Sequence, residues 1–287
     1  MKKIISLFCI FVICFSTAGC IKRDSMENIT IYTTNYPSYY VTKKLYGKFS
    51  KIESIYPKGV NIEKYSLTSK QIKDYSNSSL FIFNGLSDER EIVNKMRKYN
   101  RDLKIIDTTL SMEYVYDMNE LWLDPANLLM MARNIKAGFN EYIDSYYLSS
   151  NIEKNYENLK IDVSNLDAKF KETVLNGNSN VIATSNSMFK YLEKYGLTVY
   201  VLDENDSNIQ ITTNEVRSLI HAGKIKYIFI RNDEEENSVI KNLVANGATI
   251  QKWHTLSNLS ESDSNDHKDY FDIMNENLEL LKNELYK

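Results

Sequence analysis

Short runs of apolar and β-branched residues alternate with stretches whose apolar positions recur every three or four residues. The runs predict strands, and the periodic stretches, bounded by helix-start and helix-stop residues, predict helices. Between residues 29 and 106 the predicted strands are 29–34, 52–56, 80–83 and 103–106, and the predicted helices are 37–47, 68–74 and 89–99. This alternation is typical of parallel strands with helices on both faces of a sheet.

Two long amphipathic helices are predicted in the middle of the chain. The first covers 125–147; Asp124 caps it and a proline occupies its first position. The second is predicted to begin at Ser150, which forms a capping box with Glu153, and to stop at Gly177. At 1.5 Å per residue this second helix has a length of roughly 36 Å. That length is enough to span two lobes.

The alternation restarts after the second long helix. Strands are predicted at 181–183, 199–202, 227–230 and 248–251, helices at 188–194, 213–221 and 237–246, and a last helix after the polar run 260–269. We therefore expect an α/β protein of two lobes, each with a mostly parallel sheet flanked by helices, joined by one long rigid helix into a clamshell. The predicted division is 29–125 for the N-terminal lobe, 126–177 for the linking helices and 178–287 for the C-terminal lobe.

The N-terminus has the features of a secretory signal. Two lysines precede an apolar run at 4–15, and small residues follow it. The run is shorter than the roughly 20 residues of a spanning helix, which makes an uncleaved membrane anchor the less favoured alternative. Thr17-Ala18-Gly19 before Cys20 resembles a bacterial lipobox, with threonine where leucine is usual. This resemblance implies a lipoprotein signal peptide over 1–19 and a tether over 20–28.

Only one cysteine remains after removal of the signal, because Cys9 and Cys14 lie inside it. A single cysteine allows no disulfide and no zinc ribbon within one chain. Acyl groups such as diacylglycerol and palmitate on Cys20 would tether an exported protein to the bilayer. We expect a lipid-anchored protein on the extracytoplasmic face of the cell membrane.

Composition excludes several classes of function. Loss of Lys2 and Lys3 with the signal takes the formal charge from −3 to −5, so no basic excess points to nucleic acid. The chain lacks a phosphate-binding G-x-x-x-x-G-K-S/T, an H-E-x-x-H and a reactive cysteine, and we expect no enzyme activity. The 21 tyrosines are scattered along the sequence, and we interpret most as core and surface residues rather than a stacking site.

Five short stretches carry a resemblance to a known family. They are Thr34-Asn35-Tyr36-Pro37, LFIFNG at 80–85, WLDP at 122–125, the two runs FKYL and YGL within 189–197, and the closing segment 270–278. In this order and spacing they resemble the solute-binding lipoproteins of zinc and manganese ABC importers, the cluster A-I binding proteins, over nearly the whole mature chain. The resemblance implies a class III periplasmic-binding-protein clamshell, a monomer that delivers its solute to a membrane-embedded ABC permease.

In that family, four side chains, two from each lobe, hold one divalent metal ion, typically through histidines and carboxylates. By position the resemblance implies Glu63, Glu120 and Asn186 for three of them, and Leu256 stands at the fourth, two residues from His254. All four positions are altered. Such a mainly oxygen site suits manganese or another hard ion better than zinc, and binding no metal is the alternative.

Two other groups of residues are candidates for binding. Arg231 follows a predicted strand, at the end where open α/β sheets bind ligands. It is expected to pair with Glu63 and Glu120 in place of a metal or to bind the carboxylate of a zwitterionic solute, and a solvated surface role stays open. His254 and His267, beside the acidic residues of 260–269, form a second candidate metal site, although a solvated linker is the commoner role of such a run. His221, at a predicted helix end, is interpreted as structural.

Three functions remain in competition after the sequence. One is a binding protein that delivers a divalent metal to an ABC permease. Another is the same scaffold carrying a different small solute or none, because function resides in the site and not in the fold. The third is a surface adhesin or complex subunit that uses the clamshell only as a scaffold, which an exposed apolar patch outside the cleft would favour.

Overall fold

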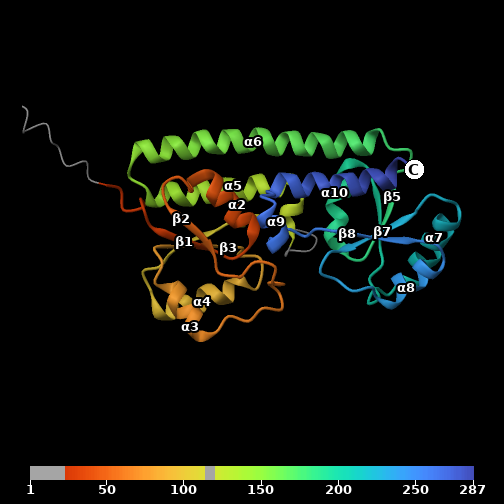
Figure 1. Cartoon of the computed structure of the whole chain (residues 1–287), viewed down its shortest axis with the longest axis horizontal. Coiled ribbons are helices and arrows are strands. Elements are labelled where there is room, and N and C mark those ends of the chain that lie inside the picture. The colour runs from red at the N-terminus through yellow and green to blue at the C-terminus, as the bar shows by residue number, and fades with distance from the viewer. Residues whose placement is uncertain (1–22, 114–119) are drawn as a thin grey trace, which may run out of the picture.

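The structure is a computed structural model that describes residues 23–113 and 120–287. Its helices and strands are arranged as two α/β lobes beneath one long helix (Figure 1). The predicted signal peptide and Cys20 lie outside the described residues.

The first lobe contains a four-stranded parallel sheet in the order β2-β1-β3-β4. Its elements are β1 (Thr30–Thr33), α2 (Tyr36–Tyr46), β2 (Lys51–Ser54), α3 (Ser69–Ser76), β3 (Leu80–Phe83), α4 (Glu89–Tyr99) and β4 (Lys104–Asp107). Alternate residues of β3 pack on opposite faces: Leu80 and Ile82 face α2 and α5, while Phe81 and Phe83 face α3 and α4. Burial on both faces explains why β3 is apolar throughout.

The second lobe repeats this topology, with a parallel sheet in the order β6-β5-β7-β8. Its elements are β5 (Val181–Thr184), η2 (Ser187–Tyr195), β6 (Thr198–Val201), α7 (Ile209–His221), β7 (Tyr227–Arg231), α8 (Ser238–Ala245), β8 (Thr249–Trp253), α9 (Glu261–Asn265) and α10 (Tyr270–Leu285). Both sheets are therefore parallel and flanked by helices, as the sequence predicted.

Helix α6 (Tyr146–Leu175) is the long helix that spans both lobes, and α5 (Pro125–Tyr142) precedes it (Figure 1). The predicted break between the two helices is wrong by several residues. Ser145, not Ser150, caps α6, with its hydroxyl accepting from the N–H of Leu148. The Oδ2 atom of Asp24 accepts the N–H groups of Asp144 and Ser145, at 2.9 and 2.8 Å, and this tertiary contact fixes the turn. The periodicity of apolar residues in a helix cannot predict such a tertiary contact.

Two further segments differ from the sequence prediction. Residues 187–195 form the 3₁₀ helix η2 rather than an α-helix, and the short helix α9 forms inside the polar run expected to be a linker. Ser260 begins α9 by accepting from the N–H of Asp263 at 3.0 Å. Ser260 followed by an acid three residues later is a helix-start signature, so this helix had a signal in the sequence.

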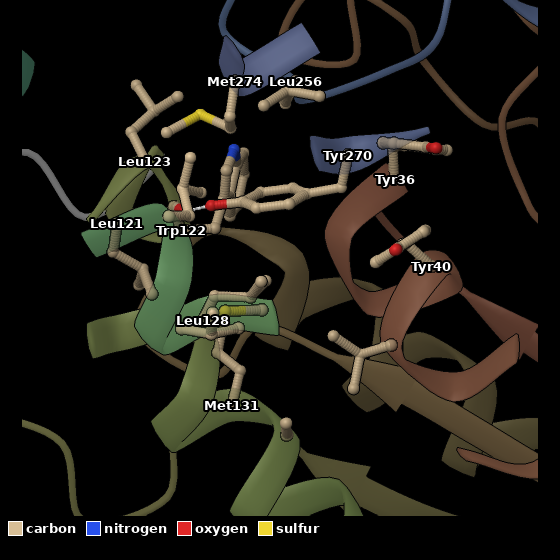
Figure 2. Close-up of a cluster of buried hydrophobic side chains, with 14 of the residues drawn as sticks. Tyr36, Tyr40, Leu121, Trp122, Leu123, Leu128, Met131, Leu256, Tyr270 and Met274 are labelled. Carbon is tan, nitrogen blue, oxygen red and sulfur yellow. Dashed lines mark hydrogen bonds between the residues drawn. The ribbon is translucent and has the colours of Figure 1, made fainter. Parts of the chain in front are cut away.

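One cluster of buried apolar side chains runs beneath α6 from the first sheet to the second. Near its middle, Trp122 donates its indole N–H to the carbonyl of Thr255 at 2.8 Å. The hydroxyl of Tyr270 donates in turn to the carbonyl of Trp122 at 2.7 Å, as Figure 2 shows. The two lobes therefore share a continuous, hydrogen-bonded core, which leaves little freedom for a hinge.

Residues 23–28, the described part of the predicted tether, pack against the first lobe. Met26 is completely buried, and its carbonyl accepts from the hydroxyls of Tyr46 and Ser50. In the described part of the chain, no helix has the length and apolar character needed to cross a membrane.

Candidate functional site

Arg231 forms three ion pairs, two of which cross between the lobes. It is the last residue of β7, and its Nη1 lies 2.8 Å from Oε1 of Glu120, which directly precedes the 3₁₀ helix η1 (Leu121–Leu123). Its Nη2 lies 3.3 Å from Oε1 of Glu63, and its Nε lies 2.9 Å from Oδ1 of Asp233. We call Arg231, Glu63, Glu120 and Asp233 the arginine cluster. The predicted pairing of Arg231 with the two glutamates is present in the structure.

The arginine cluster is partly shielded from water. The side chain of Arg231 is 12% exposed and that of Glu120 is 1% exposed, while Glu63 is 41% exposed. Burial alone would lower the pKa of Arg231, but Asp233, Glu120 and Glu63 outweigh it and raise that pKa above its usual value. Arg231 is therefore a permanent cation at the centre of the site, and a solvated surface role is wrong. Because the three carboxylates engage its guanidinium, little of it is left to bind the carboxylate of a solute.

Sequence reasoning missed Asp233. This residue takes two bonds from the guanidinium, at 2.9 and 3.3 Å, and accepts from the side-chain amide of Asn61 in the other lobe at 2.9 Å. A signal was available, since the acidic run 233–236 comes directly after a strand whose carboxyl end is a binding position.

A cavity of about 560 Å³ lies beside the arginine cluster, and Glu63 and Glu120 line it. Its walls also include the aromatic side chains of Tyr56, Tyr65 and Trp122 and the acids Asp88, Glu89 and Glu91. Glu89 is buried and accepts from the hydroxyl of Thr34, the amide of Asn35 and the backbone N–H of Asn84. Burial raises the pKa of Glu89, although these three donors act in the opposite direction. The cavity is acidic and partly aromatic.

Asn186 does not contact the arginine cluster through its side chain. Its Oδ1 caps η2 by accepting from the N–H of Met188 at 3.0 Å, and its amide group reaches Glu234 at 3.4 Å. Glu234 also accepts from the hydroxyl of Ser185 and the backbone N–H of Arg231. Asn186 therefore has a structural role. The carboxylate of Glu234 lies between its side chain and the arginine cluster.

His254 and Leu256 also lie apart from the arginine cluster. Leu256 is completely buried with a φ of 59°, and its N–H donates to Nδ1 of His254 at 2.9 Å. Nε2 of His254 lies 3.5 Å from Asp263. Burial lowers the pKa of His254, although nearby Asp263 and Glu276 raise it, so the imidazole is neutral at neutral pH. His221 ends α7, as expected.

The side chains of the site do not form a metal centre in the present arrangement. Among residues 23–113 and 120–287, no three His, Cys, Asp or Glu side chains are grouped so that they could hold a metal ion. The guanidinium alone would repel a divalent ion about 4 Å away by about 8 kcal/mol at an effective dielectric constant of about 20, which offsets part of the attraction of the three carboxylates. The carboxylates that would bind such an ion already bind Arg231.

These features define the class of protein. The fold is a class III periplasmic-binding-protein clamshell. It has two parallel sheets with the same strand order, one long helix across both lobes and a charged site between them. The lipoprotein YcdH of Bacillus subtilis, described as metal-dependent, matches with a TM-score of 0.75 at 20% identity, over 91% of this chain and 100% of that one. The Zn(II)-bound ZnuA-like domain of Streptococcus pneumoniae AdcA matches with a TM-score of 0.74 at 20% identity, over the same shares.

The family follows from the sequence match. Residues 31–284 match the family described as ZnuA, zinc-uptake complex component A, periplasmic, and the chain belongs to this family. The manganese ABC transporter substrate-binding lipoprotein PsaA of Streptococcus pneumoniae is 25% identical over the full length of both chains. The resemblance found in the sequence is confirmed.

Proposed function

We propose that this chain is the extracytoplasmic substrate-binding lipoprotein of an ABC importer, and that the arginine cluster takes the place of a transition-metal ion between its lobes. The contact of 2.8 Å between Arg231 and Glu120 carries this proposal, because it puts a permanent cation on the carboxylate at a family ligand position. The solute is then a small molecule other than a transition metal. Family membership and the name of the manganese relative support the transport role.

The remaining parts of the proposal concern anchoring and partners. Acylated Cys20 attaches the protein to the outer face of the cell membrane, and residues 20–28 connect it to the two lobes divided at 125 and 178. The protein acts as a monomer, binds without catalysis and hands its solute to a membrane-embedded permease. The names of relatives as ABC transporter lipoproteins support this arrangement.

A second candidate function is the transport of a hard divalent ion, manganese rather than zinc. It is favoured by the oxygen atoms of Glu63, Glu120 and Asp233, which all contact the guanidinium of Arg231. Glu63 and Asp233 are 41% and 23% exposed and can reach an entering ion. This function requires Arg231 to leave the cluster.

The test is elemental analysis of the full chain purified from membranes in detergent without chelator, followed by calorimetric titration with manganese and zinc. The variant is Glu63→Ala with Glu120→Ala, and the control is Glu141→Ala, an exposed glutamate of α5 outside the cleft. We expect no stoichiometric metal and no saturable heat in any of the three proteins. Stoichiometric manganese or tight zinc binding that is lost only in the double variant would overturn the proposal and establish the second candidate.

A further inference from the structure

Six tyrosines far apart in the sequence line one groove of about 1090 Å³ between the first lobe and the segment 258–269. We call this the tyrosine groove, and its tyrosines are Tyr32, Tyr36, Tyr39, Tyr40, Tyr56 and Tyr75. It shares only Tyr56 with the cavity beside the arginine cluster, so the two are separate surfaces. Folding gathers these six scattered residues from β1, α2, α3 and the segment after β2.

Two of these tyrosines present hydroxyl groups without a protein partner to the groove. Tyr36 and Tyr56 are each only 9% exposed, and both line the groove. Within the described residues, neither hydroxyl has a hydrogen-bond partner, whereas those of Tyr39, Tyr40 and Tyr75 bond to Lys43, Asp269 and the carbonyl of Ile55. Neither hydroxyl oxygen is among the buried polar atoms that lack a partner, so both reach solvent in the groove. A ligand in the groove would bond to them in place of water.

The charge left available in the groove is positive. Its two acids are already engaged: Glu53 pairs with Lys51 at 2.6 Å, and Asp269 caps α10 and accepts from the hydroxyl of Tyr40. Lys43 and Lys58 also line the groove. Neither has an acidic partner in the part of the chain that the structure describes; their ammonium groups donate to the hydroxyls of Tyr39 and Ser264. An ammonium group of this kind attracts an anionic ligand.

We propose that the tyrosine groove binds an acidic oligosaccharide. A sugar ring has apolar C–H faces and a rim of hydroxyls, and a tyrosine has the same combination of an apolar face and a polar tip. Sugar hydroxyls would bond to Tyr36 and Tyr56, and carboxylate or phosphate groups on the chain would meet Lys43 and Lys58. A volume near 1000 Å³ is at the upper end of ligand pockets and accommodates several linked rings. This binding is independent of the solute that occupies the cleft.

The test is calorimetric titration of the full chain in detergent with tetragalacturonate, its methyl ester and a phosphorylated maltotetraose. We expect saturable binding of one or both acidic sugars, and binding of the uncharged ester about tenfold weaker or worse. The two acidic sugars distinguish carboxylate from phosphate as the preferred anion. Absence of binding by both acidic sugars at up to about 10 mM, or equal affinity for the ester, overturns the proposal.

Matched variants locate the binding surface. Tyr39→Ala with Lys43→Ala changes the partly exposed rim of the groove and is expected to weaken binding at least about tenfold. The control is Tyr146→Ala with Lys154→Ala, which changes exposed residues of α6 away from the groove. Equal affinity of both double variants would overturn the assignment, as would binding of an acidic peptide by a protein that binds neither sugar. Melting temperatures within a few degrees of wild type exclude unfolding as the cause.

Discussion

The guanidinium of Arg231 lies 2.8 Å from the carboxylate of Glu120, and this contact joins the last residue of β7 in one lobe to the segment before α5 in the other. Glu120 is 1% exposed, so its charge is tolerated because the guanidinium is beside it. The cation beside Glu120 is a side chain of the protein itself.

The first prediction concerns the stability that this contact provides. Arg231→Met leaves the charge of Glu120 buried beside a neutral side chain, and we expect a loss of about 3–5 kcal/mol in the free energy of unfolding. Arg231→Met combined with Glu120→Leu replaces the buried pair by apolar groups and should recover most of that loss. Urea unfolding of both variants, with Arg133→Met on the exposed face of α5 as the control, measures the difference. A double variant as unstable as the single one would contradict this explanation.

The second prediction is that removal of the resident cation creates a metal site. Arg231→Ala leaves Glu63, Glu120 and Asp233 around an empty volume, and three carboxylates suit manganese or calcium. At a metal concentration about 100 times the dissociation constant, binding adds about 2.7 kcal/mol of stability, which is a shift of several degrees in Tm. Differential scanning fluorimetry with manganese should detect this shift in Arg231→Ala only.

Arg231→Lys is the matched control for that experiment. It keeps a positive charge at the same place and should show no response to manganese. A manganese response of the same size in the wild-type protein would mean that Arg231 does not exclude the ion.

Much of the fold could be predicted because its signals are local. Asp124 caps α5 by accepting from the N–H of Ala126, as an acid before proline indicates. The start of α6 could not be predicted, since Asp24 fixes it from 120 residues away. Hydrophobic periodicity also could not distinguish η2 from an α-helix, because a 3₁₀ helix and an α-helix with one buried face have similar spacings of apolar residues.

The candidate site was predicted in part, for a related reason. Glu63 and Glu120 were found through their positions in a family pattern, and Arg231 through its place at a strand end. Whether the three side chains meet depends on how the lobes are oriented, which no local pattern contains. Asn186 was also placed at a family position, but its side chain caps η2 instead of entering the cluster.

The third prediction concerns pH. Burial raises the pKa of Glu89 above its usual value, so the folded protein holds this proton more tightly than the unfolded chain does. The contribution of Glu89 to stability is therefore full below the unfolded pKa near 4.5 and is lost as the pH rises through the folded pKa. We expect the stability of wild type relative to Glu89→Gln to fall as the pH rises from about 4 towards neutrality.

Urea unfolding of wild type and Glu89→Gln at several pH values measures this trend. Glu141→Gln, on the exposed side of α5, is the control and should show a difference from wild type that hardly changes with pH. A constant difference between wild type and Glu89→Gln across the same range would show that Glu89 does not titrate in that window.

The last prediction separates two roles of Asp124, which caps α5 and also lies 2.5 Å from the ammonium group of Lys194 in the second lobe. Asp124→Ala removes both contacts and should cost about 1–2 kcal/mol of unfolding free energy, most of it from the lost cap. Asp124→Asn keeps the cap, because asparagine serves equally well there, and loses only a partly exposed ion pair worth about 0–1 kcal/mol. Lys194 keeps Asp167 as a partner at 2.9 Å, which limits the loss further. The urea midpoints of the two variants distinguish these roles. If Asp124→Asn is as unstable as Asp124→Ala, Asp124 stabilises the protein through its ion pair with Lys194 and not through the helix cap.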